Sequence, residues 1–238
     1  MDDAAPASGT LPETQVRAMF DRIAGVYDLL NSVMTAGMHH RWRERAADLA
    51  QVGPGDRVLD VATGTGDLAI ELQGRAGSAG EVVGLDFSES MLELARAKAP
   101  EIRFEQGNAL ELPYPDASFD AATAGFGVRN YSDLRRGFAE MRRVVRPGGR
   151  VVVLEMTTPQ RPPLSWFFRA WFDRVVPVLG RLAGDSDAYT YLPNSVRRFP
   201  GPPDLAADLA STGLVDVRWV LTAGGIIAIH AGTVPSAG

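Results

Sequence analysis

The most distinctive spacing of small and polar residues lies in VLDVATGTGDLAIEL, residues 58–72, where an apolar run turns through glycines. Gly64 and Gly66 flank Thr65, and a residue without a Cβ allows positive φ angles and a close approach of ligand to backbone. Helical spacing resumes after this turn, so unpaired backbone N–H groups are expected there. Asp86 follows about 20 residues later, where a carboxylate can accept hydrogen bonds from ribose hydroxyls. The pattern predicts a site for a nucleotide-like ligand.

The turn alone does not select the ligand. With Ala69 the spacing is formally G-x-G-x-x-A, which suits NAD as well as S-adenosylmethionine. A tight turn that holds no ligand is a further alternative.

Composition excludes several other kinds of site. The 238 residues contain no cysteine, which excludes disulfides, thiolate zinc sites and thiol nucleophiles. The net charge of -5 disfavours a nucleic-acid partner. His39-His40 has no acidic partner at ligand spacing, so no metal site is expected. Without a signal peptide or an uncharged segment of about 20 residues, we expect a cytoplasmic protein.

The elements that position the turn alternate between strands and helices. Such alternation over about 100 residues predicts an α/β fold with a parallel sheet and helices on both faces. TAGG between the last two strands predicts an antiparallel hairpin that closes the sheet. The expected strands are 57–62, 81–86, 101–105, 119–124, 150–155, 214–220 and 226–231, and the expected helices are 66–73, 89–98, 132–145, 163–182 and 203–211.

One domain is expected over 13–238, after a disordered tail at 1–12. Apolar residues at steps of three and four predict two helices within 14–51, which we expect to cover the ligand. Residues 161–200 read as a helix and loop inserted over the substrate site.

Later segments resemble known enzymes. QGNA at 106–109, RVVRPGGRVVVLE at 143–155 and the reversed final strands are similar to class I methyltransferases. Their fold is a Rossmann-like, three-layer αβα sandwich with a mostly parallel, seven-stranded sheet and a reversed C-terminal strand.

A narrower resemblance spans about residues 16–232. FDRIAGVYDLLNSVMTAGMHHRWR at 20–43 is similar to the entry signature of the quinone-ring C-methyltransferases, which methylate demethylmenaquinone and, in some bacteria, the ubiquinone precursor. RVVRPGGRVVVLEMT, GFGVRN, YLPNSVRRFP and GGIIAIHAG also resemble segments of this family. Gly125 stands where the family commonly has Ser, so no side-chain contact is carried over there.

The resemblance implies a cofactor and its contacts. It implies S-adenosylmethionine, held by Thr65, Asp86, Asn108 and Ala109, with Gly64 and Gly66 making room. The implied reaction is transfer of a methyl group to a ring carbon of a prenylated quinol, most directly demethylmenaquinol.

The reduced quinone ring is a phenol, and an unperturbed phenol has a pKa near 10, so a base or a nearby cation is needed at neutral pH. Arg129 could favour the phenolate, or it could pair with Asp133 on the surface. His230 could act as the base, or it could be a core imidazole. Tyr27 and Asn130 could bind ring oxygens, although Tyr27 also lies on the apolar stripe of its helix. Arg41 and Arg43 are expected in solvent.

Partners and alternative functions stay open at this point. The aromatic segment 163–182 could contact the inner face of the cell membrane, pack as a lid on the sheet, or form a homodimer contact. The acceptor could be another phenol, sterol or small lipid. A NAD-dependent oxidoreductase is the second alternative.

Overall fold

The computed structural model describes residues 14–19, 21–22, 35, 37–159, 162–170, 174 and 194–236. The predictions of a disordered tail at 1–12, of the contact made by Tyr27, and of most of the segment at 161–193 lie outside these residues.

Seven strands form one sheet in the order β3-β2-β1-β4-β5-β7-β6. Neighbours among β1 to β5 pair in parallel, whereas β7 is antiparallel to both β5 and β6. The predicted mostly parallel sheet with a reversed C-terminal strand is confirmed. The strands are β1 Arg57–Val61, β2 Glu81–Asp86, β3 Arg103–Gln106, β4 Phe119–Gly125, β5 Val145–Met156, β6 Val215–Thr222 and β7 Ile227–Thr233.

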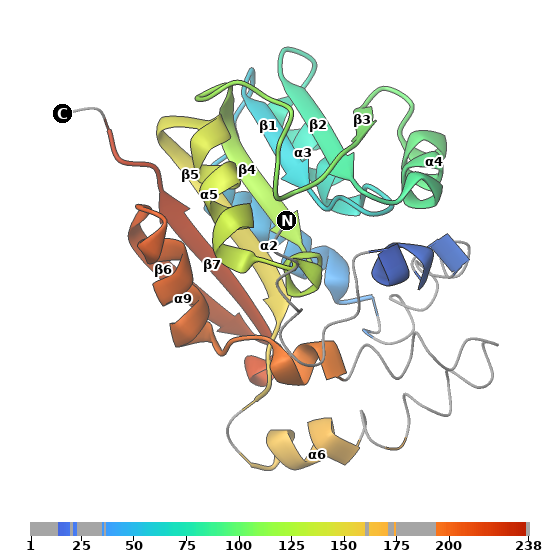
Figure 1. Ribbon diagram of the computed structural model, residues 1–238, viewed down its shortest axis with the longest axis vertical. Coiled ribbons are helices and arrows are strands. Elements are labelled where there is room, and N and C mark those ends of the chain that lie inside the picture. The colour runs from blue at the N-terminus through green and yellow to red at the C-terminus, as the bar shows by residue number, and fades with distance from the viewer. Residues whose placement is uncertain are drawn as a thin grey trace, which may run out of the picture.

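Helices cover both faces of the sheet (Figure 1). On one face α2, α3 and α4 contribute to a single apolar cluster with Val58 of β1 and Val82 of β2. On the other face α5 and α9 enclose a second cluster. In α5, Phe138, Met141 and Val144 are fully buried at the three-residue steps expected of an amphipathic helix. The helices are α2 His39–Ala50, α3 Asp67–Ala76, α4 Glu89–Lys98, α5 Leu134–Val144, α6 Leu164–Ala170 and α9 Pro202–Ser211.

The Pro-Gly-Gly segment that follows α5 belongs to β5 rather than to a separate turn. The helix ends at Val144, Val145 is already extended, and Pro147 to Gly149 lie within β5. Pairing with β4 jumps from Phe119↔Val145 to Ala121↔Arg150, so these residues form an irregularity in the strand. The glycines serve close packing here, because a Cβ at position 149 would lie 2.4 Å from the carbonyl oxygen of Asp120.

The described residues of the N-terminal segment contact the carboxyl-terminal edge of the sheet at one point. Val16 and Met19 are buried, and Asp21 accepts a hydrogen bond from the Ser88 hydroxyl at 2.5 Å. Ser88 is the N-cap of α4, directly beyond the end of β2. No helix among the described residues is both long and apolar enough to span a bilayer.

Candidate active site

A cleft opens at the carboxyl edge of the sheet, between the turn after β1 and the segments that follow β2, β3 and β4. It encloses about 910 Å³ of empty space, including its open mouth. Ligands of open α/β sheets bind at this edge, where the strand order reverses. The cleft brings together these residues singled out from the sequence: Gly64, Thr65, Asp86, Asn108, Ala109 and Asn130.

The two glycines of the turn serve different purposes. Gly64 has a φ of +57° and lines the cleft, and a Cβ at this position would meet no atom within 4 Å. Its missing side chain therefore leaves space on the ligand side. Gly66 has a φ of +82° and is buried; a Cβ there would lie 2.9 Å from Cζ of Phe104. Gly66 is thus required by the packing of α3 rather than by direct contact with a ligand.

Asp86 ends β2 and is held by the backbone of the glycine turn. Gly64 N–H donates to its Oδ2 at 2.8 Å, and Ser88 N–H donates to its Oδ1 at 2.9 Å. Burial raises the pKa of Asp86 to about 6, although the backbone hydrogen bonds from Ser88 and Gly64 oppose this shift. Each carboxylate oxygen keeps further acceptor capacity for a ligand hydroxyl.

A second buried carboxylate, Asp60, lies one residue before the end of β1 and also lines the cleft. It accepts hydrogen bonds from the hydroxyls of Thr63 at 2.6 Å and Thr123 at 2.7 Å. Burial raises the pKa of Asp60 to about 6 against the effect of these two bonds. Sequence reading missed Asp60; the available signal was a single acidic residue inside the apolar run VLDVA.

A third carboxylate, Asp67, begins α3 and is paired with two cations. Arg43 lies 3.2 Å away, and Lys98 donates to Asp67 at 2.8 Å and to the Thr65 hydroxyl at 3.0 Å. Burial alone would raise the pKa of Asp67, but Arg43 and Lys98 outweigh it and hold the pKa below its usual value. These pairs tie α2 and α4 to the start of α3.

The expectation that Arg43 lies in solvent is wrong. Its side chain is 9% exposed, lines the cleft, contacts His39 and lies over the ring of Phe126. Arg43 falls on the buried side of α2, next to Trp42 and one turn before Ala46 and Ala47. This helical spacing was the missed signal, since an arginine on a buried stripe needs an ionic partner.

Two non-glycine residues that line the cleft adopt positive φ angles. Ala62 follows β1 with a φ of 54°, and Phe126 follows β4 with a φ of 62°. Both line the cleft. A Cβ on Gly127 would lie 2.4 Å from Cβ of Ala62, so the two loops touch through this glycine. Backbone strain of this kind is concentrated at functional sites.

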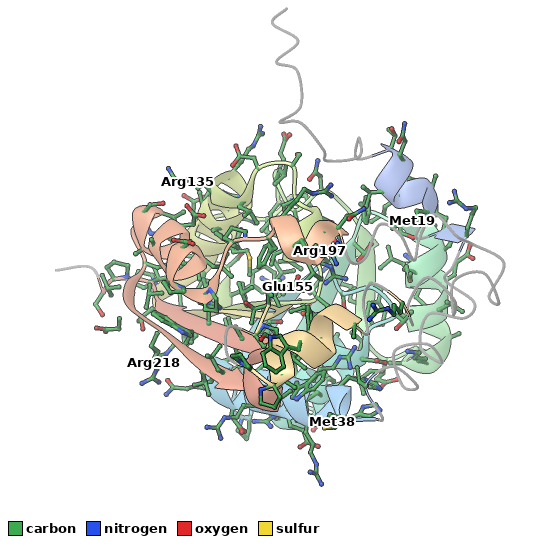
Figure 2. The ribbon with its side chains drawn as sticks, turned by 90° about the horizontal axis from the view of Figure 1, so that it is seen from below. Met19, Met38, Arg135, Glu155, Arg197 and Arg218 are labelled. Atoms are coloured by element: carbon green, nitrogen blue, oxygen red, sulfur yellow. The ribbon has the colours of Figure 1, made fainter. Side chains whose placement is uncertain are left out.

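Arg129 is buried in an ion pair rather than exposed. Its Nη1 donates to Glu155 Oε1 and to the carbonyl oxygen of Phe126, each at 2.6 Å, and the two side chains are 6% and 1% exposed. In Figure 2 Glu155 lies toward the middle of the view, whereas Arg135 and Arg218 lie at its periphery. Pairing with Asp133 is therefore wrong, since Asp133 caps α5. Arg129 is not among the described residues of the cleft lining.

His230 lies in β7 with no exposed surface. Its Nε2 is 2.9 Å from the carbonyl oxygen of Pro202, and its ring stacks on Trp219 with centroids 6.0 Å apart. Burial lowers the pKa of His230. Within the described part of the chain, it does not line the cleft either, so contact of Arg129 or His230 with an acceptor stays a prediction.

Tyr131 also lines the cleft, beside the predicted Asn130, and sequence reading missed it. Among the described residues, no group of three or more His, Asp or Glu side chains could hold a metal ion.

The charges around the turn discriminate between the two candidate ligands. Asp60, Asp67 and Asp86 line the cleft with Arg43, an excess of carboxylates that disfavours a pyrophosphate dianion. The same carboxylates suit a sulfonium and an ammonium group. The residues present therefore fit S-adenosylmethionine better than NAD.

Comparison with known proteins agrees with this geometry. The profile of the ubiE/COQ5 methyltransferase family matches residues 9–234. Demethylmenaquinone methyltransferase of Thermus thermophilus is 48% identical over 222 residues, covering 91% of this chain and 100% of the relative. The enzyme of that name from Deinococcus radiodurans is 52% identical over 203 residues, covering 83% of this chain and 84% of the relative. Ubiquinone/menaquinone biosynthesis C-methyltransferase UbiE of a Geobacter species is 40% identical, covering 92% and 96%.

Solved structures share the fold at low sequence identity. The [4+2]-cyclase SpnF superposes with a TM-score of 0.69 at 21% identity, covering 96% of this chain and 98% of that one. A SAM-dependent methyltransferase from Thermotoga maritima gives 0.65 at 19%, covering 91% and 98%. The fold is that of the class I methyltransferases, and from residue 9 to residue 234 the chain belongs to the ubiE/COQ5 methyltransferase family.

Proposed function

We propose that this protein transfers the methyl group of S-adenosylmethionine to a ring carbon of a prenylated quinol in quinone biosynthesis, with demethylmenaquinol as the acceptor. The observation that carries the proposal is 48% identity to a demethylmenaquinone methyltransferase along that relative's whole length. The cleft supports it independently, because its carboxylates and open glycine turn fit an adenosyl sulfonium.

Named residues of the cleft would hold the cofactor. Asp86 would accept hydrogen bonds from the ribose hydroxyls, and the Gly64 backbone would lie against the ligand. Asn108 and Ala109 follow β3, on the far side of Asp86 from β1, and would lie beside the adenine. Arg43 would bind the carboxylate of the methionine moiety, because it is the cation within the described lining. When bound, the cofactor supplies an electrophilic methyl group on a sulfonium with a stable, neutral leaving group.

The remaining task of the chain is to align the acceptor carbon and to exclude water. Phe126 and Asn130 line the cleft beyond β4, where an acceptor ring would enter. Arg129 donates to the carbonyl oxygen of Phe126 and pairs with Glu155 at the end of β5. We assign it a positioning role, in which its hydrogen bond to the Phe126 carbonyl holds the strained backbone at that residue.

The direct test is methylation of short-tailed demethylmenaquinol under reducing conditions, with the product identified by its mass. We expect one added methyl group on the ring. The ubiquinone precursor and simple phenols serve as comparison acceptors, and preferential methylation of a simple phenol would overturn the quinol assignment. Thermal shift with S-adenosylhomocysteine against NADH tests the cofactor separately: a ligand at 100 times its Kd stabilises by about 2.7 kcal/mol. Stabilisation by NADH alone would favour the oxidoreductase alternative.

A further inference from the structure

Tyr131 has a buried hydroxyl group that the protein does not satisfy. The residue follows the short helix Val128–Asn130 after β4 and lines the cleft. Its hydroxyl oxygen is inaccessible to solvent and has no hydrogen-bond partner among the described residues. Tyr114, by contrast, donates to Glu105 at 2.6 Å. Burying a hydroxyl without a partner destabilises the folded chain, so such groups in native proteins call for a functional explanation.

The tyrosine ring is fixed in place by its surroundings. Tyr131 N–H donates to the Val128 carbonyl at 3.0 Å. On the other side lies Gly137 of α5, where a Cβ would be 2.6 Å from Cδ2 of the ring. Glycine inside a helix weakens the helix, and here it leaves room for the ring. The position of the hydroxyl is therefore determined by packing.

The hydroxyl is available as a donor rather than as a base. Burial, and then the negative charges of Asp86, Asp60 and Glu155, raise the pKa of Tyr131, so the proton stays on oxygen. None of these carboxylates accepts that proton. Asp86 accepts from backbone N–H groups, Asp60 from two threonine hydroxyls, and Glu155 from Arg129.

We propose that Tyr131 orients the acceptor by donating a hydrogen bond to one of the ring oxygens of the quinol. The inference rests on the function proposed above. The cofactor contacts assigned there come from the segments after β1, β2 and β3 and from α2, whereas Tyr131 belongs to the segment after β4. A donor at a ring oxygen stabilises the negative charge that develops when the phenol is deprotonated. Tyr131 keeps its own proton throughout.

The test is Tyr131→Phe, with Tyr114→Phe as the matched control. For Tyr131→Phe we expect kcat/KM for short-tailed demethylmenaquinol to fall about 10-fold, the effect of losing one hydrogen bond to substrate. The Kd for a short-tailed menaquinone, followed by tryptophan fluorescence with S-adenosylhomocysteine present, should rise by a similar factor. The calorimetric Kd for S-adenosylhomocysteine should stay within about twofold.

The stability of the two variants separates an orienting role from a structural one. Tyr131→Phe removes an unsatisfied hydroxyl, so its Tm should be unchanged or higher by about 2–4 °C. Tyr114→Phe removes the partner of Glu105, so its Tm should fall while kcat/KM stays unchanged.

Three outcomes overturn one proposal or the other. Unchanged kcat/KM and menaquinone Kd in Tyr131→Phe would refute the inference alone. An equal loss of affinity for S-adenosylhomocysteine would move Tyr131 to the cofactor. Failure of the wild-type protein to methylate the quinol would refute the proposed function, and the inference with it.

Discussion

Replacing Asp86 by asparagine should separate what this residue does for cofactor binding from what it does to stability. Burial raises its pKa from 3.8 to about 6, so the folded protein binds the proton more tightly than the unfolded chain. The free energy of unfolding therefore falls as the pH rises from about 4 to about 6. From these two pKa values, the ionised side chain lowers stability by about 3 kcal/mol at pH 7.5 and by about 2 kcal/mol at pH 5.

Asparagine removes this titration but has only one oxygen for two donors. Gly64 N–H and Ser88 N–H both donate to Asp86, and one of them would lose its acceptor at a cost of about 1–3 kcal/mol. At pH 7.5 the loss and the gain offset each other to within about 2 kcal/mol. At pH 5 this gain is smaller, so the stability of Asp86→Asn relative to wild type should be about 1 kcal/mol lower at pH 5 than at pH 7.5.

The assays are urea unfolding at pH 5 and 7.5, and calorimetric titration with S-adenosylhomocysteine at pH 7.5. We expect the Kd to rise about 10- to 100-fold, because a charged acceptor of the ribose hydroxyls is lost. Asp60 titrates in the same range, and because the Asp86 charge is one of the causes that raise the pKa of Asp60, the measured difference includes a smaller contribution from Asp60. Asp116→Asn is the matched control: that carboxylate is 78% exposed and should show neither effect. Wild-type affinity in Asp86→Asn would remove Asp86 from the site, and a pH-independent difference in stability would refute the burial argument.

Three further substitutions test the other ionisable candidates. Arg129→Ala should destabilise the protein by about 3–5 kcal/mol, because it leaves the Glu155 carboxylate buried and unpaired; a loss of turnover with unchanged Tm would instead indicate direct contact with substrate. Arg43→Met should weaken S-adenosylhomocysteine binding by about 1.5–3 kcal/mol in calorimetry. Unchanged affinity would indicate that Arg43 has a structural role, through its ion pair with Asp67, and does not bind the cofactor. His230→Gln should keep the wild-type pH–rate profile, because the ring packs on Pro202 outside the described cleft lining. A change in the pH dependence of the rate in this variant would instead indicate that His230 is the general base.

The fold could be predicted from the sequence because its signals are local. Apolar runs such as RVLDV and EVVGL become β1 and β2, whose residues are buried on both faces. The last two strands pair across a short turn, as TAGG predicts. The end of α5 and the role of Pro147 to Gly149 were harder to predict from the sequence, because they depend on the pairing register between β5 and β4.

The cofactor half of the site could also be predicted from the sequence, because Gly64 and Asp86 are brought together by parallel strands that pair directly. In the acceptor half, Asn130 is the one described candidate that lines the cleft. Residue type made Arg129 and His230 candidates, but their environments are set by Glu155 and Pro202, 26 and 28 positions away. A sequence pattern does not show which of two distant partners a charged group will meet.

The unequal charge states of the three cleft carboxylates connect the fold to the choice of ligand. Asp67 is neutralised by Arg43 and Lys98, so it ties helices together at little electrostatic cost. Asp60 and Asp86 have no such cation within hydrogen-bond distance among the described residues, and burial penalises their ionised forms. A positively charged ligand lowers that penalty, whereas a pyrophosphate would increase it. We therefore expect a sulfonium cofactor to bind more tightly when Asp60 and Asp86 are ionised than when they are protonated.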